Sequence, residues 1–189
     1  MAKTETFYHG STVLFPSFDL DHAREGAGKV KFGFGVYVTS HYSSAAHYAD
    51  SKENPDAPHY VYTMEVPAIT DENYIAFKEE VKPVVISRAE AKLGCDIPAK
   101  AKADGKEFRK FLAKKLTGNT DLEGEKVASK FLESIGVEMI VWPYSWTNPA
   151  KGTNRAILDE RKVKITKIEQ VELNDKKQLV EGSQTEVIL

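Results

Sequence analysis

Cysteine is almost missing from this chain of 189 residues, in which Cys95 stands alone. A single thiol excludes a disulfide framework and a zinc site built on cysteine pairs. An excess of one charge is missing too, because 26 Lys and Arg residues are balanced by 28 Asp and Glu residues. The resulting net charge of −2 argues against a generally basic nucleic-acid-binding protein, although a local basic face stays open.

Long apolar runs are also lacking. No stretch approaches the roughly 18 residues that a membrane-spanning helix needs, and residues 1–6 hold no apolar segment of the kind found in signal peptides. We therefore expect no membrane partner and a cytoplasmic location, which would be the host cytoplasm for a protein that is phage-encoded or injected. Hydrophobic residues make up 41% of the chain, an ordinary globular share that is sufficient for a folded core.

Strand-like patterns gather toward the two ends of the chain, and helical periodicity fills the middle. Strands followed by helices and then by strands predict an α+β fold, in contrast to the alternating order of parallel α/β proteins. We also expect Ser40 to cap a short helix that carries Ala45 and Ala46. The runs that predict strands lie at 7–9, 32–39, 59–66, 137–142, 155–158 and 163–168.

The longer helical patterns lie within residues 85–136. The patterns Ser87–Glu90 and Thr120–Glu123 have the spacing of capping boxes and predict two helix starts. One helix is expected to end near Gly118, after four apolar residues at helical spacing. Those residues are Phe108, Phe111, Leu112 and Leu116.

The length predicts a single domain that carries this helical block as an insertion. We place the domain at residues 1–172, with the insertion at 85–136. Residues 173–189 are polar, and we expect them to form a loose C-terminal tail.

All five histidines lie in the first third of the chain. No two of them have the HxxxH or HxH spacing that places imidazoles together on one element, and no carboxylates are suitably spaced nearby. We therefore expect no metal. The histidines are His9, His22, His41, His47 and His59.

Three short motifs stand in a characteristic order. Residues 8–11 read Tyr-His-Gly-Ser, and residues 35–39 read Gly-Val-Tyr-Val-Thr. Tyr48 follows Tyr37 by eleven positions in an Ala-rich segment, and residues 154–159 read Asn-Arg-Ala-Ile-Leu-Asp. Together these motifs resemble the His-Tyr-Glu branch of the ADP-ribosyltransferase superfamily, which contains poly(ADP-ribose) polymerases and diphtheria toxin. The chain looks like a compact bacterial or phage member.

The resemblance implies an ADP-ribosyltransferase-like fold with two packed, mostly antiparallel sheets. It also implies that NAD is the substrate, that nicotinamide is released, and that ADP-ribose passes to a macromolecule. The compact form suggests a toxin or an effector in phage–host conflict, for which a neutralising antitoxin would be a further partner.

The family's catalytic positions fall on His9, Tyr37 and Asn154. His9 would hold a ribose, and the aromatic faces of Tyr37 and Tyr48 would stack on the nicotinamide ring. The main chain of Gly10 would pair with the carboxamide, because glycine allows close approach. The residues implied to bind the cofactor are Gly10, Ser11, Thr39 and Tyr48.

Asn154 departs from the family pattern, which has glutamate there. Asparagine can hydrogen-bond a ribose hydroxyl but cannot act as a base. Glu160 would return to the same strand face only about 20 Å further along, and Glu138 is a looser candidate. Two alternatives therefore stay open: a catalytically silent module that binds NAD or ADP-ribose, and a non-enzymatic interaction protein.

The acceptor is expected to meet the loop at 143–152, which precedes the Asn154 strand and corresponds to the target-facing loop of the family. Tyr144 and Trp146 are its candidate target-contacting residues, and their alternative role is core packing. The Lys-rich segment at 100–115 is either a solvated face or a basic surface for nucleic acid. The acceptor is accordingly a protein or single-stranded nucleic acid.

Overall fold

The computed structural model describes residues 3–20, 31–50, 54 and 56–189. Over these residues the chain has the α+β composition that its sequence patterns predict. The elements are β1 (Thr4–Ser11), β2 (Val36–Thr39), α1 (Tyr42–Tyr48), β3 (His59–Pro67), β4 (Tyr74–Ala76), α2 (Pro83–Leu93), α3 (Ala99–Lys102), α4 (Gly105–Thr117), α5 (Leu122–Ser134), β5 (Met139–Pro143), η2 (Pro149–Lys151), β6 (Thr153–Ile157), η3 (Glu160–Lys162), β7 (Lys164–Val171) and β8 (Thr185–Glu186), where η marks a short 3₁₀ helix.

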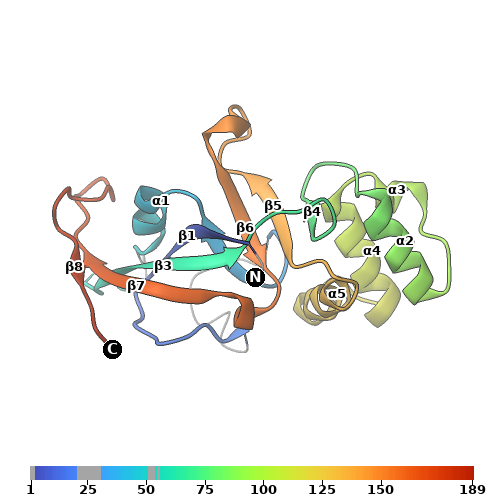
Figure 1. Ribbon diagram of the computed structural model, residues 1–189, viewed down its shortest axis with the longest axis horizontal. Helices are drawn as coiled ribbons and strands as arrows, with labels where there is room; N and C mark the ends of the chain where they lie inside the picture. Colours follow the sequence, from blue (N-terminus) through green and yellow to red (C-terminus); the bar gives the residue numbers. More distant parts are fainter. Residues whose placement is uncertain (1–2, 21–30, 51–53, 55) are drawn as a thin grey trace.

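The strands form one hydrogen-bonded sheet in the order β4-β5-β6-β2-β1-β3-β7-β8. Neighbouring strands are antiparallel except for β4 and β5, so the sheet is mixed. This differs from the two packed sheets that the resemblance implies. The two halves of the sheet nevertheless meet through a single residue pair, Tyr8 opposite Thr39. Figure 1 shows β5 and β6 running steeply across the direction of β3 and β7.

Hydrophobic cores cover opposite faces of the sheet, because alternate residues of a strand point to opposite sides. On one face, Ile140, Trp142 and Ala156 pack with buried residues of α2, α4 and α5. On the other face, Met139 and Ile157 belong to a core that also takes in the segment after β1. The residues that fill this second core are Phe7, Val36, Val38, Tyr62, Met64, Val66, Met139, Val141, Ile157 and Ile168.

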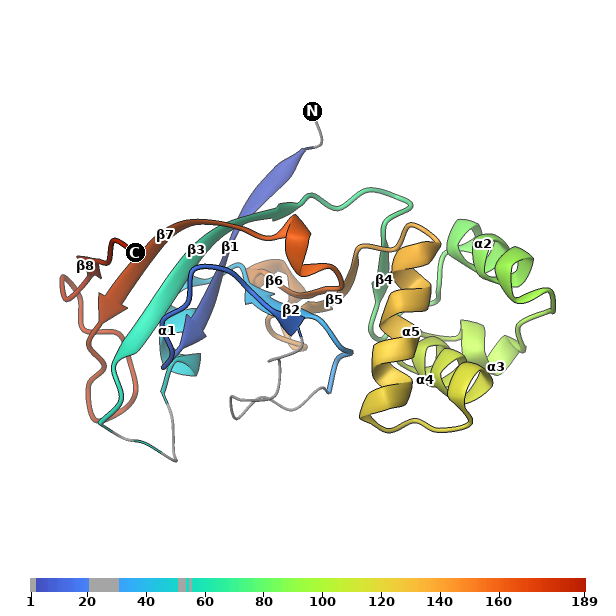
Figure 2. The ribbon, with the colours of Figure 1, turned by 90° about the horizontal axis from the view of Figure 1, so that it is seen from below.

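Helices α2–α5 form a helical unit at one end of the molecule (Figures 1 and 2). Its α4 buries Phe108 and Leu112 completely and ends at Gly118, as the apolar periodicity predicts. The helix begins at Asp104, whose carboxylate accepts a hydrogen bond from Glu107 N at 2.7 Å. The unit therefore has its own apolar interior, and the same interior also packs on the sheet.

Both capping-box predictions in the helical unit are wrong. Ser87 lies inside α2, because Pro83 already starts that helix one turn earlier. Thr120 is replaced as the cap of α5 by Asp121, whose side chain accepts from Gly124 N at 3.0 Å. Aspartate is as good an N-cap as threonine or better, so the start moves by one residue.

Ser40 also differs from its predicted role as a helix cap. The N-cap of α1 is His41, which makes no side-chain capping bond. The Ser40 hydroxyl accepts a hydrogen bond from Thr153 N at 3.0 Å, and Ser40 N donates to Thr153 O at 3.0 Å. Ser40 therefore extends the contact between β2 and β6.

The segment after residue 172 is more ordered than expected. Strand β8 pairs with β7, and Leu173 bridges to Leu179. Lys177 forms an ion pair with Asp50, which follows α1. The polar tail is thus folded back onto the edge of the sheet and the end of α1.

No helix in the described part of the chain is both long and apolar enough to span a bilayer. The same residues contain no group of three or more His, Cys, Asp or Glu side chains arranged to hold a metal ion. His22 lies outside the described residues.

Candidate functional site at the β1–β2 junction

His9 stands where the ladder between β1 and β2 ends. Its Nδ1 lies 2.7 Å from the carbonyl oxygen of Tyr37. Because a carbonyl can only accept, Nδ1 must carry the hydrogen, which leaves Nε2 of the neutral ring as an acceptor. No described residue hydrogen-bonds Nε2. We call the region formed by His9, Gly10, Tyr37, Thr39 and Asn154 the β1–β2 junction.

The surroundings keep His9 neutral. Its ring lies edge-on to Phe18 at 5.1 Å and to Tyr62 at 6.2 Å between centroids. Burial against these rings lowers the pKa of His9 below the ordinary histidine value, and the bond to the Tyr37 carbonyl opposes this only in part. The free acceptor at Nε2 is therefore present at neutral pH.

Tyr37 is held by its hydroxyl group. The phenol donates to Gly33 O at 2.8 Å and accepts from Phe32 N at 3.0 Å. Its ring meets Trp142 edge-on at 5.5 Å. Burial raises the pKa of Tyr37 to about 12, so that the phenol stays protonated and both bonds persist at physiological pH. The half-buried ring is thus fixed at its tip.

Thr39 and Asn154 lie directly opposite each other on β2 and β6. Residues paired in this way share one sheet face, and period-two alternation places Tyr37 on that face as well. Thr39 is buried, and its hydroxyl accepts from His41 N at 3.4 Å. The side chain of Asn154 is half-buried, and its amide makes no hydrogen bond to another described residue.

Two more predicted residues continue β1. A Cβ on Gly10 would lie 1.8 Å from Ala45 O, so glycine is needed there for α1 to pack directly on the strand. Ser11 accepts a hydrogen bond from Val13 N at 3.0 Å and so forms a local turn. Both residues therefore have structural roles beside their predicted ones.

Tyr48 is not brought against Tyr37. It lies at the end of α1 with 69% of its surface exposed, and its ring contact is with His47 at 5.7 Å. The described ring contacts of Tyr37 do not include it. The rings of Tyr37 and Tyr48 are therefore not in contact with each other. A flat ligand would have to lie between the two rings in order to stack on both.

The carboxylates considered as substitutes for the missing glutamate lie elsewhere. Glu138 is engaged by Lys162 Nζ and by Asn73 Nδ2, each at 2.7 Å. Strand β6 ends at Ile157, so Glu160 belongs to the 3₁₀ helix η3 instead of the strand that carries Asn154. Neither carboxylate therefore takes the place of Asn154 at the junction.

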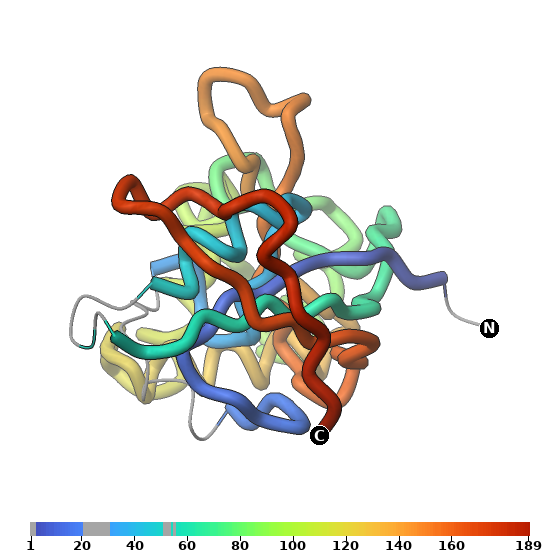
Figure 3. Tube along the Cα trace, turned by 90° about the vertical axis from the view of Figure 1, so that its left-hand side faces the viewer, coloured from blue at the N-terminus to red at the C-terminus, as the bar shows by residue number. Residues whose placement is uncertain are grey.

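The loop between β5 and β6 projects from the body of the molecule (Figures 1 and 3). Tyr144 is 40% exposed and Trp146 is 46% exposed. The Tyr144 ring lies 4.3 Å from that of His41, and Lys78 Nζ lies 4.2 Å from the Trp146 ring centroid. Both predicted target-contacting residues are accessible, beside a histidine and a lysine that the sequence did not single out.

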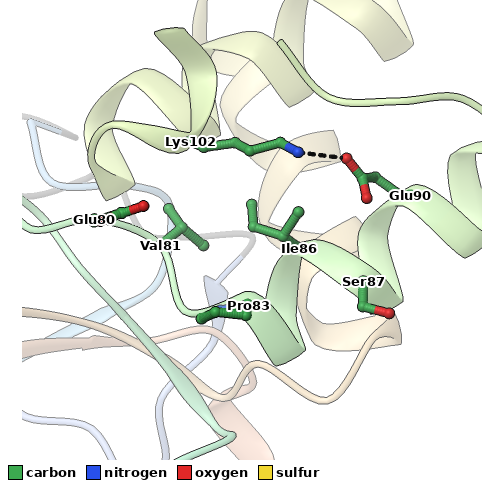
Figure 4. A pocket seen from close by; sticks show the side chains of 7 residues that line it. All are labelled: Glu80, Val81, Pro83, Ile86, Ser87, Glu90 and Lys102. Atoms are coloured by element: carbon green, nitrogen blue, oxygen red, sulfur yellow. Dashed lines mark ion pairs between the residues drawn. The ribbon is translucent and has the colours of Figure 1, made fainter. Parts of the chain in front are cut away.

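Two basic residues of the Lys-rich segment are engaged in ion pairs with acidic residues. Lys102 is paired with Glu90 at 2.7 Å, beside a hollow in the helical unit (Figure 4). Arg109 is buried with only 4% of its side chain exposed, and its Nε lies 2.9 Å from Glu125 Oε2. The signal for this burial was present, because Arg109 precedes Leu112 and Ala113 at helical spacings of three and four. The nucleic-acid prediction therefore loses part of its basis.

Comparisons with known proteins identified no relative of this chain. A search of curated proteins finds no match. A scan against protein-family models likewise finds none that matches the chain.

Proposed function

We propose that this protein is an ADP-ribosyltransferase that binds NAD at the β1–β2 junction and adopts a variant of the family's fold. The proposal rests on the three motifs, which occur in the family order, and on the neighbouring strands that carry them. The sheet order brings β1, β2 and β6 side by side. The second and third motifs, which are about 120 residues apart in the sequence, thereby lie on the neighbouring strands β2 and β6.

The bond from His9 Nδ1 to Tyr37 O is the observation that carries the proposal. It fixes the tautomer, so that Nε2 offers a lone pair that can accept a hydrogen bond from a ribose hydroxyl. The same bond ties the ribose-binding group to the residue that would stack on nicotinamide. His9 and Tyr37 project from opposite faces of their strands, so a ligand that contacts both must cross the end of the β1–β2 ladder.

The chemistry needs little covalent help from the protein. The bond between the ribose C1′ and the nicotinamide nitrogen breaks, and its electron pair leaves with the nitrogen, which becomes neutral. A lone pair of the acceptor then bonds to C1′, and the acceptor loses its proton to solvent. Holding the ribose and the departing ring in place is the main task, which hydrogen bonds and aromatic faces can perform.

Asn154 would hold a ribose hydroxyl through its free amide. Because an amide cannot accept a proton, we infer that the acceptor atom is already nucleophilic, such as the nitrogen of an unprotonated amine. The loop that carries Tyr144 and Trp146 would present it. Exposed rings with Lys78 alongside suit a nucleobase in single-stranded nucleic acid, or a protein side chain. Such an activity fits a toxin or a phage–host conflict effector restrained by an antitoxin.

The experiment follows both halves of NAD. Purified protein is incubated with NAD labelled in the adenylate part and with total cell lysate, which is then separated into protein, RNA and DNA. Released nicotinamide is measured in the same samples. We expect release of nicotinamide and label in one fraction, with both reduced in Tyr37→Ala. Trp146→Ala should lose labelling but keep slow hydrolysis of NAD, because the loop would serve the acceptor alone.

A silent NAD- or ADP-ribose-binding module is the second candidate, and the amide at position 154 favours it. Binding of NAD without release of nicotinamide would support this module and exclude the transferase. Absence of both binding and release would leave a non-enzymatic interaction protein. Calorimetric titration with NAD and with ADP-ribose distinguishes these two outcomes.

A further inference from the structure

A buried guanidinium connects the helical unit to the turn that holds Tyr37. Arg109 of α4 donates from Nη2 to Lys31 O at 3.3 Å. Its Nη1 packs so closely on Gly33 that a Cβ there would come within 2.9 Å of it. Gly33 has φ of +116°, a conformation that favours glycine. The turn at 31–33 is therefore shaped around the guanidinium.

The same turn supplies both hydrogen bonds of the Tyr37 hydroxyl, from Phe32 N and to Gly33 O. Phe32 is in turn stacked on Trp142 with centroids 4.1 Å apart and rings nearly parallel. Trp142 also meets the Tyr37 ring. A displacement of the turn would therefore move the tip of Tyr37 and the aromatic surface beside it together.

The ion pair that fixes Arg109 is poorly satisfied for its depth. Arg109 Nε and Glu125 Oε2 are 2.9 Å apart but lack hydrogen-bond geometry, and Arg109 Nη1 has no hydrogen-bond partner among the described residues. Ser129 Oγ beside them is likewise unpaired within the described part of the chain. A buried pair of this kind is weak as a source of stability, because desolvation offsets the attraction. The contacts of Arg109 with the turn at 31–33 offer another reason for the presence of this buried pair.

We propose that Arg109, held by Glu125, is a positioning residue that sets the orientation of the Tyr37 ring for NAD. The helical unit would then contribute to substrate binding without touching the substrate. The consequence for NAD rests on the proposed function above, whereas the orientation of Tyr37 is a property of the protein alone. The experiment therefore measures both.

The main variant is Arg109→Met with Glu125→Met, because replacing both partners of a buried pair by apolar residues avoids an unpaired buried charge. Arg109→Lys is the second variant: it keeps the charge, but one ammonium cannot reproduce the planar fork that reaches both Glu125 and Lys31 O. Lys114→Met, on the same helix and exposed, is the matched control. Circular dichroism and thermal unfolding verify that each variant folds.

Two readouts test the orientation. In protein labelled with 3-fluorotyrosine, the Tyr37 fluorine resonance is assigned with Tyr37→Phe, and we expect it to shift or broaden in both Arg109 variants while that of Tyr48 stays fixed. In steady-state assays we expect KM for NAD to rise about tenfold and kcat to change less than about threefold, because stacking acts on ground state and transition state alike. Lys114→Met should change neither readout.

An unchanged Tyr37 resonance in folded Arg109 variants would overturn the positioning role. A shifted resonance with wild-type KM for NAD would also overturn it, since the orientation would not matter for the substrate. If the wild-type protein neither binds nor cleaves NAD, the proposed function fails. In that case the fluorine spectrum alone decides whether Arg109 orients Tyr37.

Discussion

At the scale of single residues, one hydrogen bond determines what His9 can do. Its Nδ1 is committed to the Tyr37 carbonyl, and the aromatic rings around it disfavour a second proton. Protonation at Nε2 would remove the only acceptor of the ring and place a charge beside Phe18. Acid should therefore affect both the stability of the junction and the ribose binding that we propose for it.

The first prediction concerns this proton. Because the pKa of His9 is lower in the folded state than the ordinary value of about 6.5, the unfolded state binds more protons below that pH. Stability should then fall as the pH drops below about 6.5. We expect urea unfolding from about pH 7.5 to about pH 5 to show a steeper loss for the wild type than for His9→Gln, which does not titrate. Parallel curves would mean that His9 is not held neutral.

Asn154 gives the second prediction. If its amide holds the ribose in the transition state, Asn154→Ala should lower nicotinamide release about 100-fold, or about 2.7 kcal/mol. Glu160→Gln should matter less, because Glu160 lies in η3 beyond the end of β6. Paired rate measurements and chemical mapping of the linkage provide the check. A larger effect at Glu160, or ADP-ribose attached to a hydroxyl, would transfer the catalytic role away from Asn154.

The sequence predicts which residues form a site, but it does not predict their contacts. Motif order predicts that His9, Tyr37 and Asn154 belong to one site, and the sheet order brings their strands side by side. The bond between His9 and a main-chain carbonyl 28 positions away has no sequence signature. The burial of Arg109 was missed for a different reason: in a Lys-rich segment, charge outweighed its place on the apolar stripe.

At the scale of elements, the packing of α1 on β1 depends on the absence of a Cβ atom at Gly10. Gly10 faces Ala45 O so closely that any Cβ would overlap the helix backbone. Strand β3 supports the same contact, since Val61 lies in the core beneath α1. The position of α1, and with it that of Tyr48, is therefore set by the main chain of β1.

The third prediction is that Gly10→Ala destabilises the protein by about 3 kcal/mol, because overpacking against a helix backbone cannot be relieved by a change of rotamer. Gly182→Ala is the control: its φ is +80°, and nothing lies near the added carbon. It should cost only about 1 kcal/mol of backbone strain. Chemical denaturation measures both. An equal loss of unfolding free energy in the two variants would show that α1 can move away from β1 at little cost.

Periodicity predicted the longer helices and strands, but it missed the short elements β4, α3 and β8 and misplaced two helix starts. The stripe in α4 and its end at Gly118 were predictable, because burial repeats every three or four residues. Helix α2 starts earlier than predicted because Pro83 occupies its first turn, and α5 starts one residue later because Asp121 caps it. The division of the sheet into halves was not predictable, because it depends on how few residue pairs join β1 to β2.

At the scale of the whole molecule, Arg155 strengthens the joint between the halves of the sheet. It extends from β6, donates to Pro67 O at 2.8 Å, and pairs with Glu5. Its guanidinium carbon also lies 4.1 Å from the centroid of the Phe7 ring. One side chain of the β6 half thus binds β1 and the end of β3 in the other half.

The fourth prediction follows from this joint. Arg155→Ala should lower the free energy of unfolding by about 3 kcal/mol, because it removes a buried cation together with its stacking and hydrogen bonds. Glu5→Gln should cost about 1 kcal/mol, since that carboxylate is 41% exposed and the carbonyl of Pro67 still binds the guanidinium. Urea denaturation of both variants measures the difference. A reversed order would mean that the carboxylate is the essential partner.

The order of strands in the sheet also has a consequence for synthesis on the ribosome. Tyr37 pairs across to Ala156 and Tyr62 to Ile168, so β2 and β3 each wait for a neighbour made more than about 100 residues later. At about 5–20 residues per second that delay lasts roughly 5 to 20 seconds, during which the local contacts of α2–α5 can already form. A nascent chain would therefore carry a folded helical unit before it has a complete β1–β2 junction. Under the proposed function, activity would begin only after β6 and β7 have been translated.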